Sequence, residues 1–209
     1  WRRFIDDIAL LWLGGEDSLK QFLQWLNCQH PTIKFTANYG TRNIPFLDMS
    51  VSISEGRITT DLHRKETDAQ MTLPFNSCHP RHCVRSIPFS QALRLRRICS
   101  EDSSFEQRTK ELCDRFTRRG YPRSLVEAAV AKVAAVPRED TLTYKDKQQT
   151  TNAKRTPYII THNPTNPPLG NWLRNSMPLL HKSRRLRQAV PHAPMVGERN
   201  CHNLRRMLM

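Results

Sequence analysis

Short alternating runs of apolar and polar residues dominate the first third of the chain. Residues 1–13 place two aspartates between apolar runs, and a glycine pair ends the element, which favours two short buried strands around an acidic turn. An i, i+3, i+4, i+7 apolar spacing over residues 19–26 predicts an amphipathic helix. Residues 33–37 alternate as a strand, and residues 46–64 alternate as a hairpin that turns at Glu55-Gly56.

Helical spacing replaces this alternation after the hairpin. Apolar residues recur at helical intervals over 79–97, with a break at Pro88, then over 101–119 and over 122–136. Gly120 follows the second of these segments and is a typical residue at a helix C-terminus. The three segments predict a compact helical module.

The last part of the chain is polar and basic. Residues 137–157 predict a linker, residues 158–160 a short strand, and residues 169–182 a modest helix that Pro178 interrupts. We expect the remainder to be largely irregular. The whole pattern therefore predicts an α+β fold with a helical middle and an irregular basic tail.

Positive charge is concentrated in the middle and the tail. The 209 residues include 33 Lys+Arg and 19 Asp+Glu, which gives a formal net charge of +14. Residues 1–80 carry a net charge of −1, residues 81–136 carry +6, and residues 137–209 carry +9. A field of this sign favours nucleic acid as the partner, with an anionic membrane surface second and a merely solvated basic surface as the plain alternative.

The chain carries no segment that would direct it into or across a membrane. No apolar run reaches the roughly 20 residues that span a bilayer, and no basic-then-apolar leader is present. We therefore expect a nuclear or cytoplasmic protein that is not secreted, has no membrane partner and keeps its six cysteines reduced. Because the chain begins at Trp1, we interpret it as a fragment of a longer protein.

One cysteine–histidine cluster invites a zinc interpretation. Cys78, His79, His82 and Cys83 are close in sequence, but on a helix Cys78 and His82 would share one face and the other two residues another face. Packing at a helix start is therefore favoured over zinc. The Cys201-His202 pair is weaker still, because no second pair lies nearby.

The residues with the clearest chemical meaning are two adjacent aspartates in the segment Phe4-Ile5-Asp6-Asp7-Ile8. Two carboxylates between apolar strands are costly to bury as ions, and a divalent cation removes that cost. Nucleotidyl transfer uses carboxylates to hold two Mg²⁺ ions about 4 Å apart. An exposed turn that carries two aspartates is the plain alternative.

A series of short motifs begins with this segment and continues along the chain. They are Phe4–Ile8, Leu26-Asn27, His30–Thr36, Phe46-Leu47-Asp48, Thr60–Lys65, Ser77–Pro80, Ile87–Gln91, Arg94–Ser100 and Arg119–Pro122. Their order resembles the C-terminal half of a reverse-transcriptase palm followed by its thumb, and most closely the Penelope-like retroelement reverse transcriptases. Residues 161–164 and 196–199 resemble, more loosely, a connector towards a GIY-YIG nuclease, and residues 77–122 also resemble segments classed as a helix-turn-helix domain.

The resemblance implies a role for each matching residue. Asp6 and Asp7 would be catalytic ligands of a two-ion Mg²⁺ site that is incomplete in this piece, and Phe46-Leu47-Asp48 would be the primer grip. Deoxynucleotides, an RNA template and a DNA primer, or an RNA–DNA hybrid, would be the partners. The residues expected to bind nucleic acid are Lys34, Phe46, Leu47, Asp48, Lys65, Arg94, Arg96 and Arg97, although the three arginines have an alternative as a solvated helix face.

The resemblance divides the chain into the C-terminal half of a palm (1–66), a helical thumb or helix-turn-helix-like module (67–136) and a basic linker towards an endonuclease domain (137–209). A complete polymerase also needs a catalytic carboxylate on an earlier strand and a fingers region, and this sequence, which begins at Trp1, contains neither. We therefore predict that this piece alone does not extend a primer. The alternative function is a non-enzymatic helix-turn-helix protein that binds nucleic acid, and the oligomeric state stays open.

Overall fold

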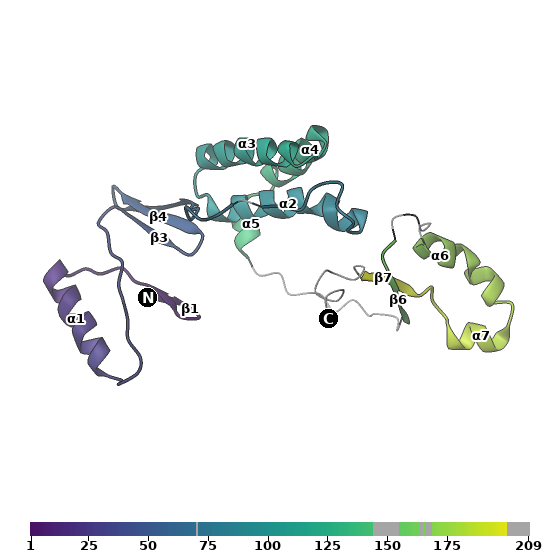
Figure 1. Cartoon of the computed structure of the whole chain (residues 1–209), viewed down its shortest axis with the longest axis horizontal. Helices are drawn as coiled ribbons and strands as arrows, with labels where there is room; N and C mark the ends of the chain where they lie inside the picture. The colour runs from purple at the N-terminus through teal and green to yellow at the C-terminus, as the bar shows by residue number, and fades with distance from the viewer. Residues whose placement is uncertain (70, 144–154, 164, 166–168, 200–209) are drawn as a thin grey trace, which may run out of the picture. The chain divides into compact units, whose positions relative to one another are not determined.

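The structure, a computed structural model, describes residues 1–69, 71–143, 155–163, 165 and 169–199. Its elements are mixed α and β (Figure 1). The described strands form three separate small sheets, with the orders β1-β2, β3-β4-β5 and β6-β7. None of the described helices combines the length and the apolar character that crossing a membrane requires.

The N-terminal hairpin surrounds the acidic turn as predicted. Strand β1 (Arg2–Phe4) pairs antiparallel with β2 (Asp7–Ala9), and Ile5 and Asp6 form the turn. The expectation that these strands are buried is wrong, since Phe4 is 54% exposed and Ile5 is 71% exposed. Two strands of three residues that pair only with each other cannot enclose their own side chains.

The predicted amphipathic helix is α1 (Glu16–Cys28), in which Leu19 is buried. The expected strand over residues 33–37 is absent from the described chain. The Asn27 side chain instead holds this segment, because its Oδ1 accepts from the Phe35 backbone N at 2.6 Å and its Nδ2 donates to the Phe35 carbonyl at 3.0 Å. Because the Asn27 amide bonds both the N–H and the C=O of Phe35, these backbone groups are not available to a neighbouring strand.

The expected hairpin is present within a three-stranded antiparallel sheet of β3 (Asn43–Phe46), β4 (Met49–Ser54) and β5 (Arg57–Leu62). Glu55 and Gly56 connect β4 to β5 with φ values of 51° and 74°, as a two-residue type I′ turn requires. Two bonds attach β5 to the end of α2 (Arg81–Ile98). The Thr60 hydroxyl donates to the Ile98 carbonyl at 2.6 Å, and the Thr60 backbone N donates to the hydroxyl of Ser100, just after the helix, at 2.9 Å.

All three helices of the central segment form. They are α2, α3 (Asp102–Arg118) and α4 (Arg123–Ala134). The predicted break at Pro88 is wrong, since α2 continues through this residue and buries its ring completely. Proline removes one helical hydrogen bond, and here the burial of the ring offsets that loss. Gly120 ends α3 with φ of 80°, in the left-handed conformation that glycine adopts without strain.

The described chain divides into two compact units, Trp1–Met71 with Leu93–Leu112, and Thr72–Ala92 with Cys113–Met209. The boundaries expected after residues 66 and 136 stay predictions. Within the first unit, β5 bonds to the end of α2 and to α3. Apolar side chains are buried in each unit. In the first they are Leu19, Leu62, Leu95, Ile98, Cys99, Phe105 and Leu112, and in the second Val84, Ala92, Phe116, Tyr121, Val126, Val133 and Met177.

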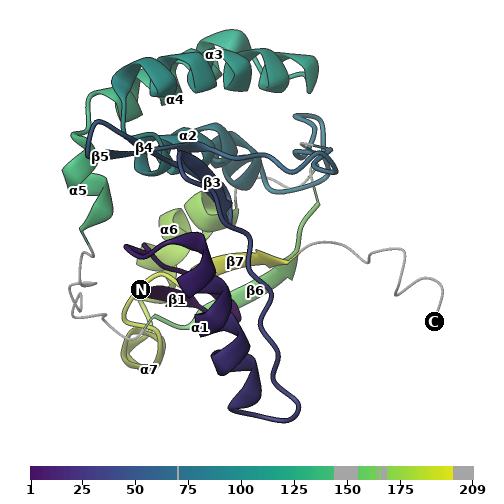
Figure 2. The same ribbon diagram turned by 90° about the vertical axis from the view of Figure 1, so that its left-hand side faces the viewer.

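The strand expected over residues 158–160 and the helix expected over residues 169–182 are present, whereas the largely irregular remainder expected after residue 136 is wrong for the described residues. Helix α5 (Arg138–Leu142) lies inside the expected linker, whose residues 144–154 lie outside the described chain. Strand β6 (Pro157–Thr161) pairs with β7 (Met195–Arg199) in parallel, and the two lie side by side in Figure 2. A parallel pair requires a long crossover connection, so local patterns do not reveal it.

The crossover from β6 to β7 carries two helices, α6 (Leu169–Leu180) and α7 (Arg184–Ala189). Pro178 lies inside α6 and does not interrupt it, contrary to the prediction. Beside the parallel pair, His162 Nδ1 lies 2.6 Å from Glu198 Oε2. This contact and the five-residue register give residues 157–162 and 195–199 a defined local structure.

Candidate nucleic-acid interface

The acidic turn is the site that the sequence singled out most strongly. Asp6 lies in the turn, Asp7 begins β2, and both are exposed. Arg3 holds the turn, since its Nε donates to the Ile5 carbonyl at 2.6 Å, and Ile5 adopts a positive φ of 55°. Such a value is unusual for a β-branched residue and costs conformational energy.

The two carboxylates do not by themselves fit a two-ion magnesium centre. Mg²⁺ takes six oxygen ligands, of which proteins commonly supply one or two carboxylates. Among the described residues, no group of three or more His, Cys, Asp or Glu side chains could hold a metal ion. Asp6 and Asp7 therefore offer part of a ligand set, and no catalytic step follows from them alone.

Lys34 has a role that needs no ligand. Its Nζ donates to the Asn27 carbonyl at 2.5 Å and to the His30 carbonyl at 3.4 Å. These carbonyls lie at and just after the C-terminus of α1, where unpaired backbone oxygens favour a cation. The structure thus places Lys34 at a helix end, separate from the other predicted residues.

The turn between β3 and β4 is fixed to the end of α2 by an ion pair. Leu47 has φ of 56° in this two-residue turn, and Asp48 follows it. Arg94 Nε and Nη2 both donate to Asp48 Oδ2, at 3.0 and 2.5 Å. Phe46, the last residue of β3, is half-buried.

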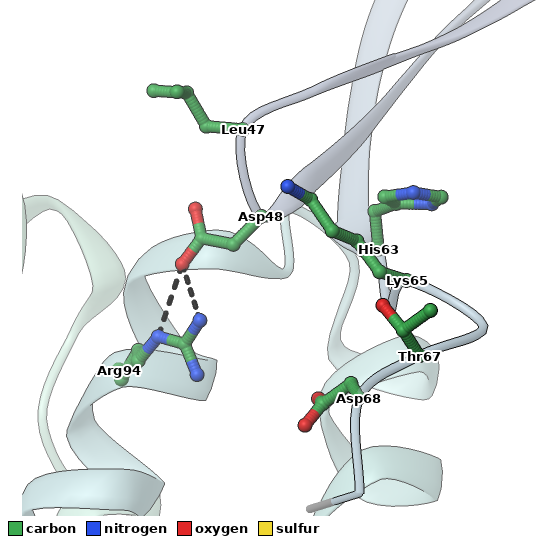
Figure 3. Close-up of a pocket in the computed structure, with 7 residues that line it drawn as sticks. All are labelled: Leu47, Asp48, His63, Lys65, Thr67, Asp68 and Arg94. Carbon is green, nitrogen blue, oxygen red and sulfur yellow. Dashed lines mark hydrogen bonds and ion pairs between the residues drawn. The ribbon is translucent and has the colours of Figure 1, made fainter.

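A cavity of about 210 Å³ brings together four of the eight residues predicted to bind nucleic acid. Leu47 and Asp48 come from the turn, Arg94 from α2, and Lys65 from the segment after β5; Figure 3 shows the Lys65 amine extended towards the turn. Small-molecule sites usually exceed about 300 Å³, so this cavity suits one polar group of a larger ligand. The remaining lining residues are His63, Thr67 and Asp68.

Sequence reasoning missed these three lining residues as site residues. His63 lies inside a motif that carried the resemblance, and the backbone N of His63 donates to the Asp48 carbonyl at 2.9 Å. This bond brings the segment after β5 beside the turn. Asp48 and His63 are 15 positions apart in the sequence, and the antiparallel pairing of β4 with β5 brings them together.

Arg96 and Arg97 are adjacent on α2 and lie in different surroundings. The Arg96 side chain is only 13% exposed; it pairs with Asp102 at 2.5 Å and lies 5.2 Å from the centre of the Phe105 ring. Arg97 is exposed. Arg96 therefore holds α2 against the start of α3, and Arg97 is the better placed of the two to contact a ligand.

Helix α2 carries a pronounced excess of positive charge. Its 18 residues include five arginines, one histidine and no acidic residue. By contrast, α3 and α4 mix both signs. The exposed arginines of α2 are Arg81, Arg85, Arg94 and Arg97.

An ion-pair network ties β5 to α3. Arg108 donates to both oxygens of Asp61, at 3.2 and 2.7 Å, and also reaches Glu111 at 3.0 Å. The Arg108 hydrogen bond lowers the pKa of Asp61. Burial, with the neighbouring Asp61 carboxylate, raises the pKa of the Cys99 thiol to about 11, so this thiol is not a nucleophile at neutral pH.

The cysteine–histidine cluster lies at the start of α2. Cys78 and His79 precede the helix, while His82 and Cys83 lie in its first turn. The Ser77 hydroxyl lies 2.5 Å from His79 Nδ1, and Cys83 Sγ lies 3.3 Å from His82 Nε2. Cys201 and His202 lie outside the described residues.

Comparison with known proteins identifies one segment. Residues 71–130 match the family model of the animal helix-turn-helix domain, a span that contains α2, α3 and most of α4. The resemblance of residues 77–122 to such domains is therefore confirmed. No curated protein and no solved structure matches the chain. The chain thus carries a helix-turn-helix segment, which points to a nucleic-acid partner.

Proposed function

We propose that this chain binds nucleic acid through the basic surface of its helix-turn-helix segment. The observation that carries the proposal is the charge of α2, which lies inside the matched segment and has five arginines and no acidic residue. Cationic side chains on one helix neutralise backbone phosphates and release counterions. The formal net charge of +14 adds a long-range attraction for a polyanion.

Within this function, we propose that the chain is the C-terminal palm and thumb of a retroelement reverse transcriptase of the Penelope-like kind. The proposal is supported by the order of an Asp-Asp hairpin, a helix, a sheet with the Phe46-Leu47-Asp48 turn, and a basic helical segment. In the complete enzyme, Asp6 and Asp7 would contribute to Mg²⁺ binding, and the metal would activate nucleotidyl transfer. This chain's own residues would hold the template and primer in the nucleus or cytoplasm.

The second candidate is a helix-turn-helix protein without enzymatic activity. It is favoured by the same matched segment, and the two candidates differ in the nucleic acid that they prefer. A thumb contacts backbone phosphates and prefers an RNA–DNA hybrid without regard to sequence. A transcription-factor-like module reads base edges in the major groove of DNA and prefers one sequence.

Fluorescence anisotropy with the whole chain distinguishes these candidates. Labelled RNA–DNA hybrid, double-stranded DNA of mixed sequence and single-stranded DNA are titrated over a series of salt concentrations. We expect binding that weakens steeply with salt, shows no sequence preference and is tightest for the hybrid. A sequence-specific duplex complex would support the second candidate, and no binding to any of the three would contradict both.

A primer-extension assay tests the catalytic assignment separately. The whole chain, a primed RNA template, deoxynucleotides and Mg²⁺ should give no extended product, because the described residues bring together only two of the carboxylates that the chemistry needs. Mg²⁺-dependent product that disappears in Asp6→Asn would overturn this expectation. Unchanged oligonucleotide binding in Asp6→Asn is the matched control.

A further inference from the structure

One stripe of the basic helix α2 combines an arginine with an exposed aromatic ring. Arg85 and Phe89 are four residues apart, so they lie one above the other on the same face of the helix, about 6 Å apart along its axis. Arg85 is exposed, and no hydrogen bond or ion pair engages it within the described part of the chain. Phe89 is 39% exposed, although its neighbour Pro88 is completely buried.

The surroundings keep this stripe open. Ser86 and Ser90 lie beside it, and their hydroxyls donate back to the Cys83 and Ser86 carbonyls, at 2.8 and 3.1 Å. Short side chains that bond to their own helix do not cover the neighbouring ring. Arg81, one turn earlier, is held at Phe75, since its Nη1 donates to the Phe75 carbonyl at 3.3 Å and its guanidinium lies 5.6 Å from the ring centre.

We propose that Arg85 and Phe89 bind an unpaired nucleotide, with the Phe89 ring stacked on the base and the Arg85 guanidinium on the adjoining phosphate. An aromatic ring beside a cation is the arrangement by which proteins hold single strands without reading their sequence. In a duplex the base faces are already stacked on one another, so the ring finds its partner only at a single-stranded end or gap. This inference rests on the proposed nucleic-acid binding and specifies the form of nucleic acid that α2 recognises.

Variants of Phe89 separate stacking from a general apolar contact. The whole chain is titrated with a short oligothymidylate, with the same sugar–phosphate chain lacking its bases, and with a blunt duplex. We expect Phe89→Leu to bind the oligothymidylate about tenfold more weakly, and Phe89→Trp to bind it as well as the wild type or better. Affinity for the baseless chain and for the duplex should change in neither variant.

The effect of Arg85→Ala on binding is compared with that of a lysine-to-alanine substitution elsewhere in the same unit. Arg85→Ala should weaken binding to both single strands and reduce the salt dependence of the logarithm of affinity by about 0.7, the value for one phosphate contact on a single strand. Lys132→Ala on α4 removes an equal, exposed charge and should leave that slope nearly unchanged. Circular dichroism of each variant checks that the helices are intact.

The outcomes distinguish this inference from the function on which it rests. If the chain binds the oligonucleotides and Phe89→Leu binds oligothymidylate like the wild type, the stacking proposal is wrong and nucleic-acid binding stands. If Phe89→Leu weakens the duplex and the baseless chain equally, Phe89 supports the fold of α2 and does not stack on a base. If the wild type binds none of the probes, both proposals fail.

Discussion

Arg94 and Asp48, which are 46 residues apart in the sequence, form an ion pair in which Nε and Nη2 of the arginine both donate to one carboxylate oxygen. The pair joins the β3–β4 turn to the end of α2 and forms one wall of the cavity that Lys65 also lines. The resemblance had assigned both residues to nucleic-acid binding, Asp48 as part of the primer grip and Arg94 as one of three nearby arginines. Their contact means that the phosphate-binding capacity of Arg94 is partly neutralised by Asp48.

Asp48→Asn should therefore bind nucleic acid more tightly than the wild type. The substitution removes one negative charge and releases Arg94, so we expect a severalfold gain in affinity at low salt that shrinks as salt is added. The free energy of unfolding should fall by only about 0.5 kcal/mol, because both side chains are more than 40% exposed. Anisotropy titration and urea denaturation measure the two effects, and Arg94→Ala, which should lose affinity, is the control.

Arg108→Ala should destabilise the first unit. It leaves the half-buried Asp61 without its main hydrogen-bond donor, and we expect a loss of about 2 kcal/mol in the free energy of unfolding. Arg123→Ala is the matched control, since it removes an exposed arginine that pairs with Glu127 within one helix, and it should leave stability unchanged. Equal stability of the two variants in urea denaturation would contradict the role of the network.

The same network predicts a dependence of stability on pH. Arg108 lowers the pKa of Asp61 in the folded protein, so this carboxylate stabilises the fold above its unfolded pKa of about 3.9. That contribution is lost as the pH falls through the lower folded value. Urea denaturation at steps from neutral to acidic pH should show the loss in the wild type, and Arg108→Ala should show a shallower one.

The cysteines should differ sharply in reactivity. Burial and the Asp61 carboxylate raise the pKa of Cys99 to about 11, whereas Cys78 and Cys83 are exposed. At mildly alkaline pH, iodoacetamide should alkylate these two cysteines and the likewise exposed Cys28 quickly, and reach Cys99 only after denaturant is added. Peptide mass spectrometry locates the labels, and rapid labelling of Cys99 in the native chain would show that the end of α2 opens readily.

Ile5→Gly should stabilise the N-terminal hairpin. Ile5 has a φ of 55°, which costs a residue with a Cβ about 1 kcal/mol or more, while its exposed side chain contributes little by burial. We expect slower amide exchange in β1 and β2 for Ile5→Gly and no gain for Ile5→Val, which keeps the β-branch. Faster exchange in the glycine variant would mean that the isoleucine side chain holds the turn.

Local sequence patterns correctly predicted the elements whose hydrogen bonds join residues only a few positions apart. The hairpin at Glu55-Gly56 and the end of α3 at Gly120 were predicted correctly, because the required backbone conformations favour glycine at short range. The strand over residues 33–37 was wrong because Asn27, outside that window, bonds both backbone groups of Phe35. Pro88 was wrongly expected to break the helix, because the burial of its ring depends on the packing of its surroundings.

The sequence by itself determined that α1, α2, α3, α4 and α6 form, that the chain turns at Glu55-Gly56 and where positive charge gathers, since these depend on spacing and composition along the chain. Only the tertiary structure decided that Leu47, Asp48, Lys65 and Arg94 line one cavity, that Arg96 is packed while Arg97 is exposed, and that β6 pairs with β7. The physical reason is the range of the interactions. The hydrogen bonds of a helix or a tight turn join residues that are only a few positions apart. A salt bridge or a parallel strand pair can join residues that are far apart in the sequence, and no local pattern identifies them.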